Sequence, residues 1–98
     1  MKYLKEYGIS EKQIKELKER YNDGIIEFLT NEEIFVKQTL DYLKEKKFLI
    51  YPILENNIKI FLETTVALKN KIKKMEEKGY SNKTIQMMLI NEELYNKQ

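Results

Sequence analysis

One twelve-residue pattern occurs three times in this chain of 98 residues, and it limits the possible folds more than any other feature. The three segments are YLKEYGISEKQI at 3–14, YLKEKKFLIYPI at 42–53 and KMEEKGYSNKTI at 74–85. Each segment has three apolar residues at intervals of five, which are Leu4, Ile9 and Ile14, then Leu43, Phe48 and Ile53, then Met75, Tyr80 and Ile85. The second and third segments begin 32 residues apart (42 to 74), and the first begins 39 residues before the second (3 to 42). The sequence therefore predicts a short stack of helix pairs built from a repeat of roughly 32 residues.

Glycine and serine give each outer segment the signature of a corner between two helices. Gly8 and Gly79 match, and glycine enters the left-handed conformation that ends a helix at little cost. Ser10 and Ser81 follow at the position of a residue that caps the next helix, and Gln13 lies at the spacing of a capping box. We therefore expect Gly8 and Gly79 at equivalent helix-ending corners, with Ile9 and Tyr80 packed beneath them.

The rest of the chain predicts an all-α fold of about seven helices in a single domain, residues 1–98. In the middle segment Pro52 suits a first helical position, with Tyr51 extended before it. A capping box at 30–33 predicts a helix from Thr30 to about Lys47, and a second long helix is expected from about Ile58 to Lys78. Asn91 is expected to cap a final short helix. The predicted core contains Leu40, Phe61, Leu68, Ile72 and Met75.

The residue types that are missing exclude much chemistry. The chain has no cysteine and no histidine, so it lacks thiolates, the commonest general base and the commonest transition-metal ligand. Both serines, Ser10 and Ser81, lie where helix caps are expected, and the glutamate pairs lie beside lysines or near helix starts. We therefore expect a protein that is not an enzyme and that uses no cofactor or metal.

The formal net charge of +2 lies entirely in the second half of the chain. Residues 69–83 contain six lysines and two glutamates. On a helix, Lys71, Lys74 and Lys78 share one flank of the apolar seam, and Lys83 follows the corner. Evenly spaced cations suit contacts with backbone phosphates, so these four lysines are the candidate nucleic-acid-binding residues. A solvated face beside the core is the alternative interpretation, and the single arginine, Arg20, argues against base-specific recognition.

A protein-interaction module of phage, plasmid or regulatory type is the alternative function. The chain has seven tyrosines and four methionines, residue types that are favoured at contact surfaces. Met87, Met88 and Tyr95 lie near the C-terminal end, where they could cover the core or mediate a homodimer. No apolar run is long enough to span a membrane, and the first residues lack the apolar stretch of a signal peptide. We therefore expect no membrane partner and a cytoplasmic location.

The repeated corner resembles a known family. A helical unit of roughly 30 residues, with a leucine, a glycine and a capping serine at the corner and then a short apolar segment such as IIEFL or IKIFL, resembles the repeat of the mitochondrial transcription termination factor family. YLKEYGISEKQIKEL and KMEEKGYSNKTIQMML are the best-matching stretches. The resemblance implies a helical solenoid that binds nucleic acid along one charged face.

A second resemblance concerns GYSNKTIQMML at 79–89, which looks like the first helix of a helix-turn-helix motif, as in response-regulator output domains. That motif requires a glycine-containing turn next, but INEELYNKQ follows and contains no glycine. The same corner also occurs at Gly8, Ile9 and Ser10. The recurrence favours a packing unit over a DNA-reading helix.

Overall fold

The computed structural model describes residues 1–98 and contains nine helical segments and no strand. They are the 3-10 helix η1 (Lys2–Tyr7) and the α-helices α1 (Glu11–Arg20), α2 (Asp23–Asn31), α3 (Glu33–Glu45), α4 (Ile50–Asn56), α5 (Lys59–Leu62), α6 (Thr65–Glu77), α7 (Asn82–Ile90) and α8 (Glu92–Asn96). None of them is long and apolar enough to cross a membrane. The predicted all-α class is confirmed, whereas the expected number of about seven helices is too low.

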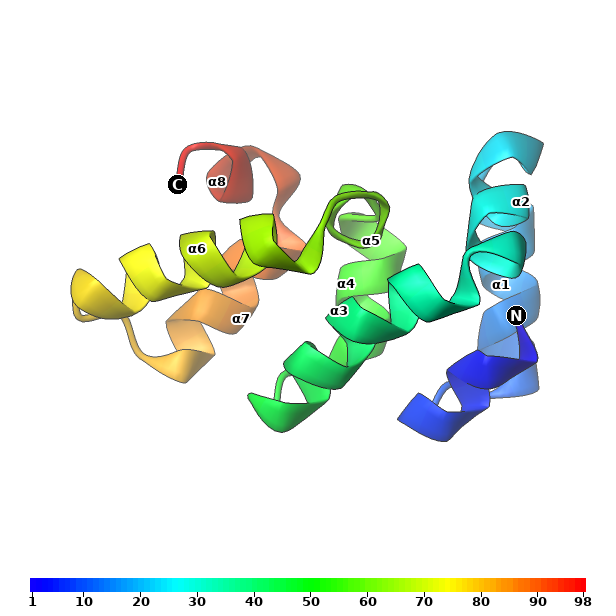
Figure 1. The fold of residues 1–98 in the computed structure, drawn as a ribbon, viewed down its shortest axis with the longest axis horizontal. Coiled ribbons are helices and arrows are strands. Elements are labelled where there is room, and N and C mark those ends of the chain that lie inside the picture. The colour runs from blue at the N-terminus through cyan, green and yellow to red at the C-terminus, as the bar shows by residue number, and fades with distance from the viewer.

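The helices follow one another along an elongated molecule that measures 36 × 22 × 21 Å. Figure 1 shows η1, α1 and α2 at one end, α3, α4 and α5 in the middle, and α6, α7 and α8 at the other end. We refer to these sets as the N-terminal, central and C-terminal groups. In each group the first element is followed by a chain reversal and then by the second helix (Figure 1).

Three left-handed turns produce these reversals. Gly8, Lys47 and Gly79 have φ angles of 80°, 65° and 85°, and they occupy the same position in the three repeated segments. At each turn the following amide donates a hydrogen bond to the carbonyl five residues earlier, which gives the pairs Ile9–Leu4, Phe48–Leu43 and Tyr80–Met75. This bond defines the Schellman motif, which satisfies a carbonyl at the end of a helix. The predicted equivalence of Gly8 and Gly79 is confirmed, and Lys47 adopts the same conformation without being glycine.

The side chain that follows the left-handed turn is buried at the first two corners and partly exposed at the third. Ile9 and Phe48 are buried beneath their turns, as predicted for Ile9. Tyr80 is 39% exposed, so the expectation that it packs beneath its turn is wrong. A tyrosine at a surface can bury its ring in part and leave its polar tip in water.

Side-chain caps begin most of the longer helices. Ser10 and Gln13 form the predicted capping box of α1, in which each side chain bonds the other residue's amide. The hydroxyl of Ser81 caps α7 by accepting from the amide of Thr84. Asn22 and Asn91 cap α2 and α8 in the same way. These caps satisfy amides that have no partner within the helix.

The helix predicted to start at Thr30 begins later, because the break between α2 and α3 lies at Glu32. Thr30 does not cap a helix: it lies in α2, and its hydroxyl donates to the carbonyl of Ile26. Once that bond forms, the threonine side chain is satisfied within α2 and is not free to cap the next helix. The break falls at Glu32, which has φ −102° and makes no side-chain cap.

The predicted helix from Ile58 to Lys78 is interrupted at Glu63, which is extended with ψ 168°. The hydroxyl of Thr64 then caps α6 by accepting from the amide of Ala67. Pro52 is the third residue of α4 and Tyr51 is helical, so the predicted extended Tyr51 is also wrong. A proline is tolerated there because the first amides of a helix have no intrahelical partner.

The core is one continuous cluster of 23 buried apolar residues. All five side chains predicted for the core belong to it, which are Leu40, Phe61, Leu68, Ile72 and Met75. Phe61 contributes from α5 and the last three from α6, because the break at Glu63 keeps both helices against α3. The apolar periodicity therefore identified the buried face even where the helix boundary was wrong.

Three short helices, α1, α4 and α7, lie side by side, and polar side chains join their C-terminal ends. The hydroxyl of Tyr21 donates to the carbonyls of Leu54 and Glu55 at the end of α4. The side-chain amide of buried Asn57 donates to the carbonyl of Leu89 at the end of α7. Carbonyls at a helix end are therefore satisfied by a side chain of the preceding group.

We expect Leu68→Ala to lower the free energy of unfolding by ~2–5 kcal/mol, because Leu68 is 1% exposed and truncation leaves a cavity. Val66→Ala is the matched control on the same helix, since Val66 is 65% exposed. Its effect should stay within about 0.5 kcal/mol. Urea denaturation of both variants makes the comparison, and similar small losses would show that α6 does not pack as described.

Opposite effects are expected from two substitutions at equivalent corners. Gly79→Ala should destabilise the fold by about 1 kcal/mol, because an alanine in the left-handed region is strained even though open space surrounds the position. Lys47→Gly should stabilise it by about 0.5–1 kcal/mol, because relief of that strain exceeds the entropy that glycine adds to the unfolded chain. Thermal and urea melts measure the change in the free energy of unfolding of each variant. A destabilised Lys47→Gly would contradict the left-handed geometry at Lys47.

Candidate nucleic-acid interface

The corner between α6 and α7 forms one tip of the molecule (Figure 1). The segment that makes this tip carries six lysines, which are Lys69, Lys71, Lys73, Lys74, Lys78 and Lys83. None of them lies within 4.0 Å of a carboxylate oxygen. Of the two glutamates in the same segment, Glu76 pairs with Lys46 at 2.9 Å. The positive charge of the tip is therefore not neutralised by direct ion pairs.

Three of the four predicted binding residues are exposed around this corner. Lys74 lies in the last turn of α6, Lys78 follows that helix, and Lys83 lies in the first turn of α7. The left-handed turn at Gly79 brings these helix ends together. Lys78 also approaches the side-chain oxygen of Gln98, at 3.4 Å.

Lys71, the fourth predicted residue, has internal contacts that the sequence did not reveal. Its ammonium lies 4.0 Å from the centroid of the Tyr95 ring and donates to the Tyr95 carbonyl at 3.3 Å. Tyr95 is 1% exposed, so Lys71 covers a core side chain of α8. An ammonium over an aromatic face is stabilising, and more so as water is excluded. Lys71 therefore fixes α8 against α6.

Tyr95 and Met88 cover the core at the C-terminal end, and both are buried. The hydroxyl of Tyr95 has no hydrogen-bond partner, and burial raises its pKa to about 12, with Glu63 adding to the shift. Met87 points out and is 63% exposed. Of the three residues considered for a homodimer contact, only Met87 is on the surface.

The other flank of α6 carries two lysines that the sequence analysis did not select. Lys69 lies 5.2 Å from the centroid of the Tyr42 ring on α3, and Lys73 is exposed. They belong to the same tip although they fall on the opposite side of the helical seam. Lys69 and Lys73 could have been selected because they belong to the lysine-rich segment 69–83. They were not selected because helical periodicity places them on the other flank from Lys74 and Lys78.

The lysine row on α6 matches the flank of α3 that receives the next group of helices. Counting 32 residues back, Lys71, Lys74 and Lys78 correspond to Thr39, Tyr42 and Lys46 on α3. The hydroxyls of Thr39 and Thr65 lie 2.8 Å apart, the Tyr42 ring contacts Lys69, and Lys46 pairs with Glu76. This flank of α3 thus contacts α6, whereas the matching flank of α6 carries lysines and is partly covered by α8.

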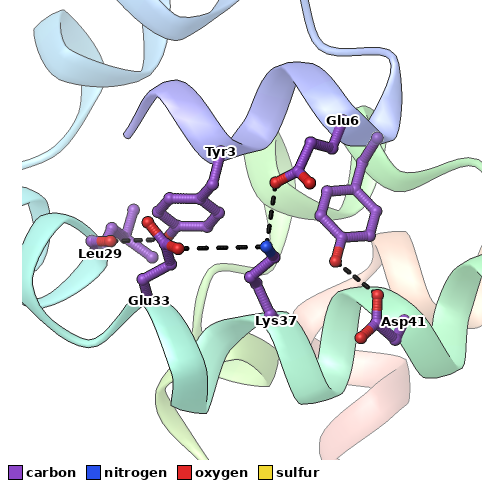
Figure 2. Close-up of polar contacts among 7 residues, drawn as sticks. Tyr3, Glu6, Leu29, Glu33, Lys37 and Asp41 are labelled. Carbon is purple, nitrogen blue, oxygen red and sulfur yellow. Dashed lines mark hydrogen bonds and ion pairs between the residues drawn. The ribbon is translucent and has the colours of Figure 1, made fainter.

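A second charged region lies between η1 and α3, where one lysine meets acidic side chains (Figure 2). Lys37 lies between two carboxylates, 3.0 Å from Glu6 and 4.0 Å from Glu33. The hydroxyl of Tyr7 donates to Asp41, and burial followed by this bond raises the pKa of Tyr7 above its usual value. These contacts of Lys37 and Tyr7 fix η1 on α3.

The tyrosines are largely used inside the protein. The hydroxyls of Tyr3, Tyr7, Tyr21 and Tyr51 each donate to an internal acceptor, and Tyr3 reaches the carbonyl of Leu29 (Figure 2). Burial raises the pKa of Tyr3 to about 12. These long-range bonds account for tyrosines that the sequence analysis assigned to a contact surface, and no local pattern identifies their partners.

The chain matches no protein-family model, no curated protein and no solved structure. The assignment of a site therefore depends on the geometry of the molecule. No group of three or more acidic side chains is positioned to hold a metal ion. The lysines without carboxylate partners at the α6–α7 tip are therefore the candidate site.

Lys71→Gln should destabilise the fold by about 1 kcal/mol, because it removes the ammonium from the face of the Tyr95 ring. Lys74→Gln is the matched control, since it makes the same change one turn away on an exposed side chain. We expect it to alter the free energy of unfolding by less than about 0.5 kcal/mol. Urea melts that gave both variants the stability of the parent protein would show that Lys71 does not hold α8.

Proposed function

We propose that this protein is a non-enzymatic nucleic-acid-binding module that contacts backbone phosphates through the α6–α7 tip. The observation that carries the proposal is that six lysines of residues 69–83 pair with no carboxylate, and that four of them, Lys73, Lys74, Lys78 and Lys83, are exposed without a contact to an aromatic ring. Lys74, Lys78 and Lys83 are the principal contacts. Lys71 adds charge to the site, although its ammonium also binds Tyr95.

Lysines bind phosphates as flexible point charges, and they release condensed counterions from the nucleic acid when they do so. Such binding depends strongly on salt and weakly on sequence. The only arginine, Arg20, donates to the carbonyl of Glu55 and lies in α1, at the other end of the stack. Little discrimination between bases is therefore expected.

We further propose that the stack is built from a repeat. The helices α3 and α6 each have 13 residues and begin 32 residues apart (33 to 65). The three left-handed turns and their hydrogen bonds lie at matching positions. These features support the resemblance to the repeat of the mitochondrial transcription termination factor family, and with it a charged face that receives nucleic acid.

The position of the lysine row also supports binding at the end of the stack. On α3 the corresponding flank holds α6 through Thr39, Tyr42 and Lys46. On α6 the same flank is cationic and has no long helix beside it. A phosphate backbone would find on this flank a row of cations that no carboxylate of the chain pairs with.

The triple change of Lys74, Lys78 and Lys83 to glutamine should abolish nucleic-acid binding without changing the fold. Three phosphate contacts give a slope of about −2 to −3 for the logarithm of affinity against the logarithm of salt concentration. Exposed charges contribute little to stability, so the melting temperature should hold. Fluorescence anisotropy with duplex DNA, single-stranded DNA and RNA measures binding at low salt.

A charge-matched control replaces Lys12, Lys44 and Lys47, which lie outside the tip. It should retain binding close to that of the parent protein. No binding by the parent at micromolar protein in low salt, or equal loss in both triple variants, would refute the proposal. The protein-interaction alternative would then stand, supported by the exposed side chains of Met87 and Leu94 near the C-terminal end, with a homodimer as its simplest form.

A further inference from the structure

We propose a second anion site, in a cleft between η1 and α1, which binds a compact chain of phosphate groups. The cleft has a volume of about 380 Å³ and is lined by Met1, Lys2, Lys5, Glu11, Ile14, Lys15 and Lys18. It belongs to the N-terminal group, at the opposite end of the stack from the α6–α7 tip (Figure 1). The proposal goes beyond the nucleic-acid interface and does not depend on it.

Charge is the first observation that points to an anion. Four of the seven lining residues are lysines, and the single carboxylate, Glu11, pairs with Lys5. Lys2, Lys15 and Lys18 form no ion pair. The lining therefore has a formal side-chain charge of +3 around a small volume. Like charges that converge in this way repel one another, and a polyanion would relieve the repulsion.

The contrast with the neighbouring face of η1 shows that this charge is not imposed by packing. On that face Lys37 is held between Glu6 and Glu33, where η1 meets α3 (Figure 2). The cleft lies where η1 meets α1 instead, and its three unpaired lysines make no internal hydrogen bond. They are consequently not needed to join the two helices.

The shape of the cleft indicates the class of ligand. Ile14 is only 8% exposed and, with Met1, supplies the apolar part of the lining, while the lysines supply the charged part. A volume of this size lies within the range of about 300–1,000 Å³ that is usual for small-molecule sites. A ligand with a phosphate chain on the lysines and an attached group against Met1 and Ile14 would match both parts of the lining. Nucleoside triphosphates have that chemistry, and the free end of a nucleic acid presents it too.

The experiment compares Lys15→Gln/Lys18→Gln with the charge-matched Lys12→Gln/Lys47→Gln in the full chain. Lys12 is on the same helix as Lys15 and Lys18 but does not line the cleft, and Lys47 is in the central group. Tripolyphosphate and ATP are titrated by calorimetry at low salt. Since each lysine gives a charge-assisted contact to the phosphate chain, losing two lysines should weaken tripolyphosphate binding at least about tenfold.

The control variant should change that affinity less than about twofold, and Lys15→Arg/Lys18→Arg should retain binding because it keeps both charges. Backbone amide shifts on titration should be confined to residues 2–18. Tighter binding of ATP than of tripolyphosphate supports the apolar part of the cleft as a contact for the attached group.

The proposal would be overturned by no binding of either probe, by equal weakening in both double variants, or by amide shifts centred on residues 69–83. Loss of duplex binding in Lys15→Gln/Lys18→Gln without tripolyphosphate binding by the parent would also overturn it, and would assign these lysines to a nucleic-acid backbone. The triple change of Lys74, Lys78 and Lys83 leaves the cleft intact, so the two proposals fail independently.

Discussion

The hydrogen bond that closes each left-handed turn is the interaction on which the arrangement of the helices depends. In the first two corners it places an apolar side chain, Ile9 or Phe48, beneath the turn and into the core. The chain then reverses, and the second helix of each group lies against the first. Because a helix end leaves carbonyls without partners, the bond satisfies a group that would otherwise need water. The same local geometry therefore ends one helix, directs the next and anchors both to the core.

Stacking of the groups depends on a second set of polar contacts, at helix ends that have no glycine. Tyr21 reaches the end of α4, and Asn57 reaches the end of α7, so each side chain satisfies a carbonyl of the next group. Asn57 is buried, and its own side-chain oxygen has no partner. An unsatisfied buried acceptor is unfavourable, so its retention indicates that the bond to Leu89 contributes to the register of the stack.

Local signals made much of this fold predictable, and contacts between distant segments made the rest unpredictable. The corners at Gly8 and Gly79 and the cap at Ser10 followed from residues within five positions of one another. The breaks at Glu32 and Glu63 carry neither glycine nor proline, and they form where α2 and α5 pack against α3. A pattern of apolar residues that continues across such a break gives the buried face correctly and the helix boundary wrongly.

The candidate sites, too, were predictable where they depend on local sequence and unpredictable where they depend on contacts between distant residues. Helical periodicity placed Lys74 and Lys78 on one exposed flank, and the corner brought Lys83 beside them. The contact of Lys71 with Tyr95 joins residues 24 positions apart, which no periodicity in the sequence shows. The N-terminal cleft is formed by lysines of two helices that meet only when the chain folds, and glutamates lie between the lysines of η1 and those of α1 in the sequence.

The distribution of ion pairs shows which lysines of the two outer groups are left without a carboxylate partner, in a protein whose net charge is only +2. Three pairs cross between groups, and in each the lysine belongs to the central group, at Lys37, Lys46 or Lys59. Their carboxylates, on Glu6, Glu76 and Glu92, come from the two outer groups. The outer groups thus use acidic side chains to hold the stack together, and many of their own lysines are left unpaired. Both proposed anion sites lie among these unpaired lysines of the outer groups.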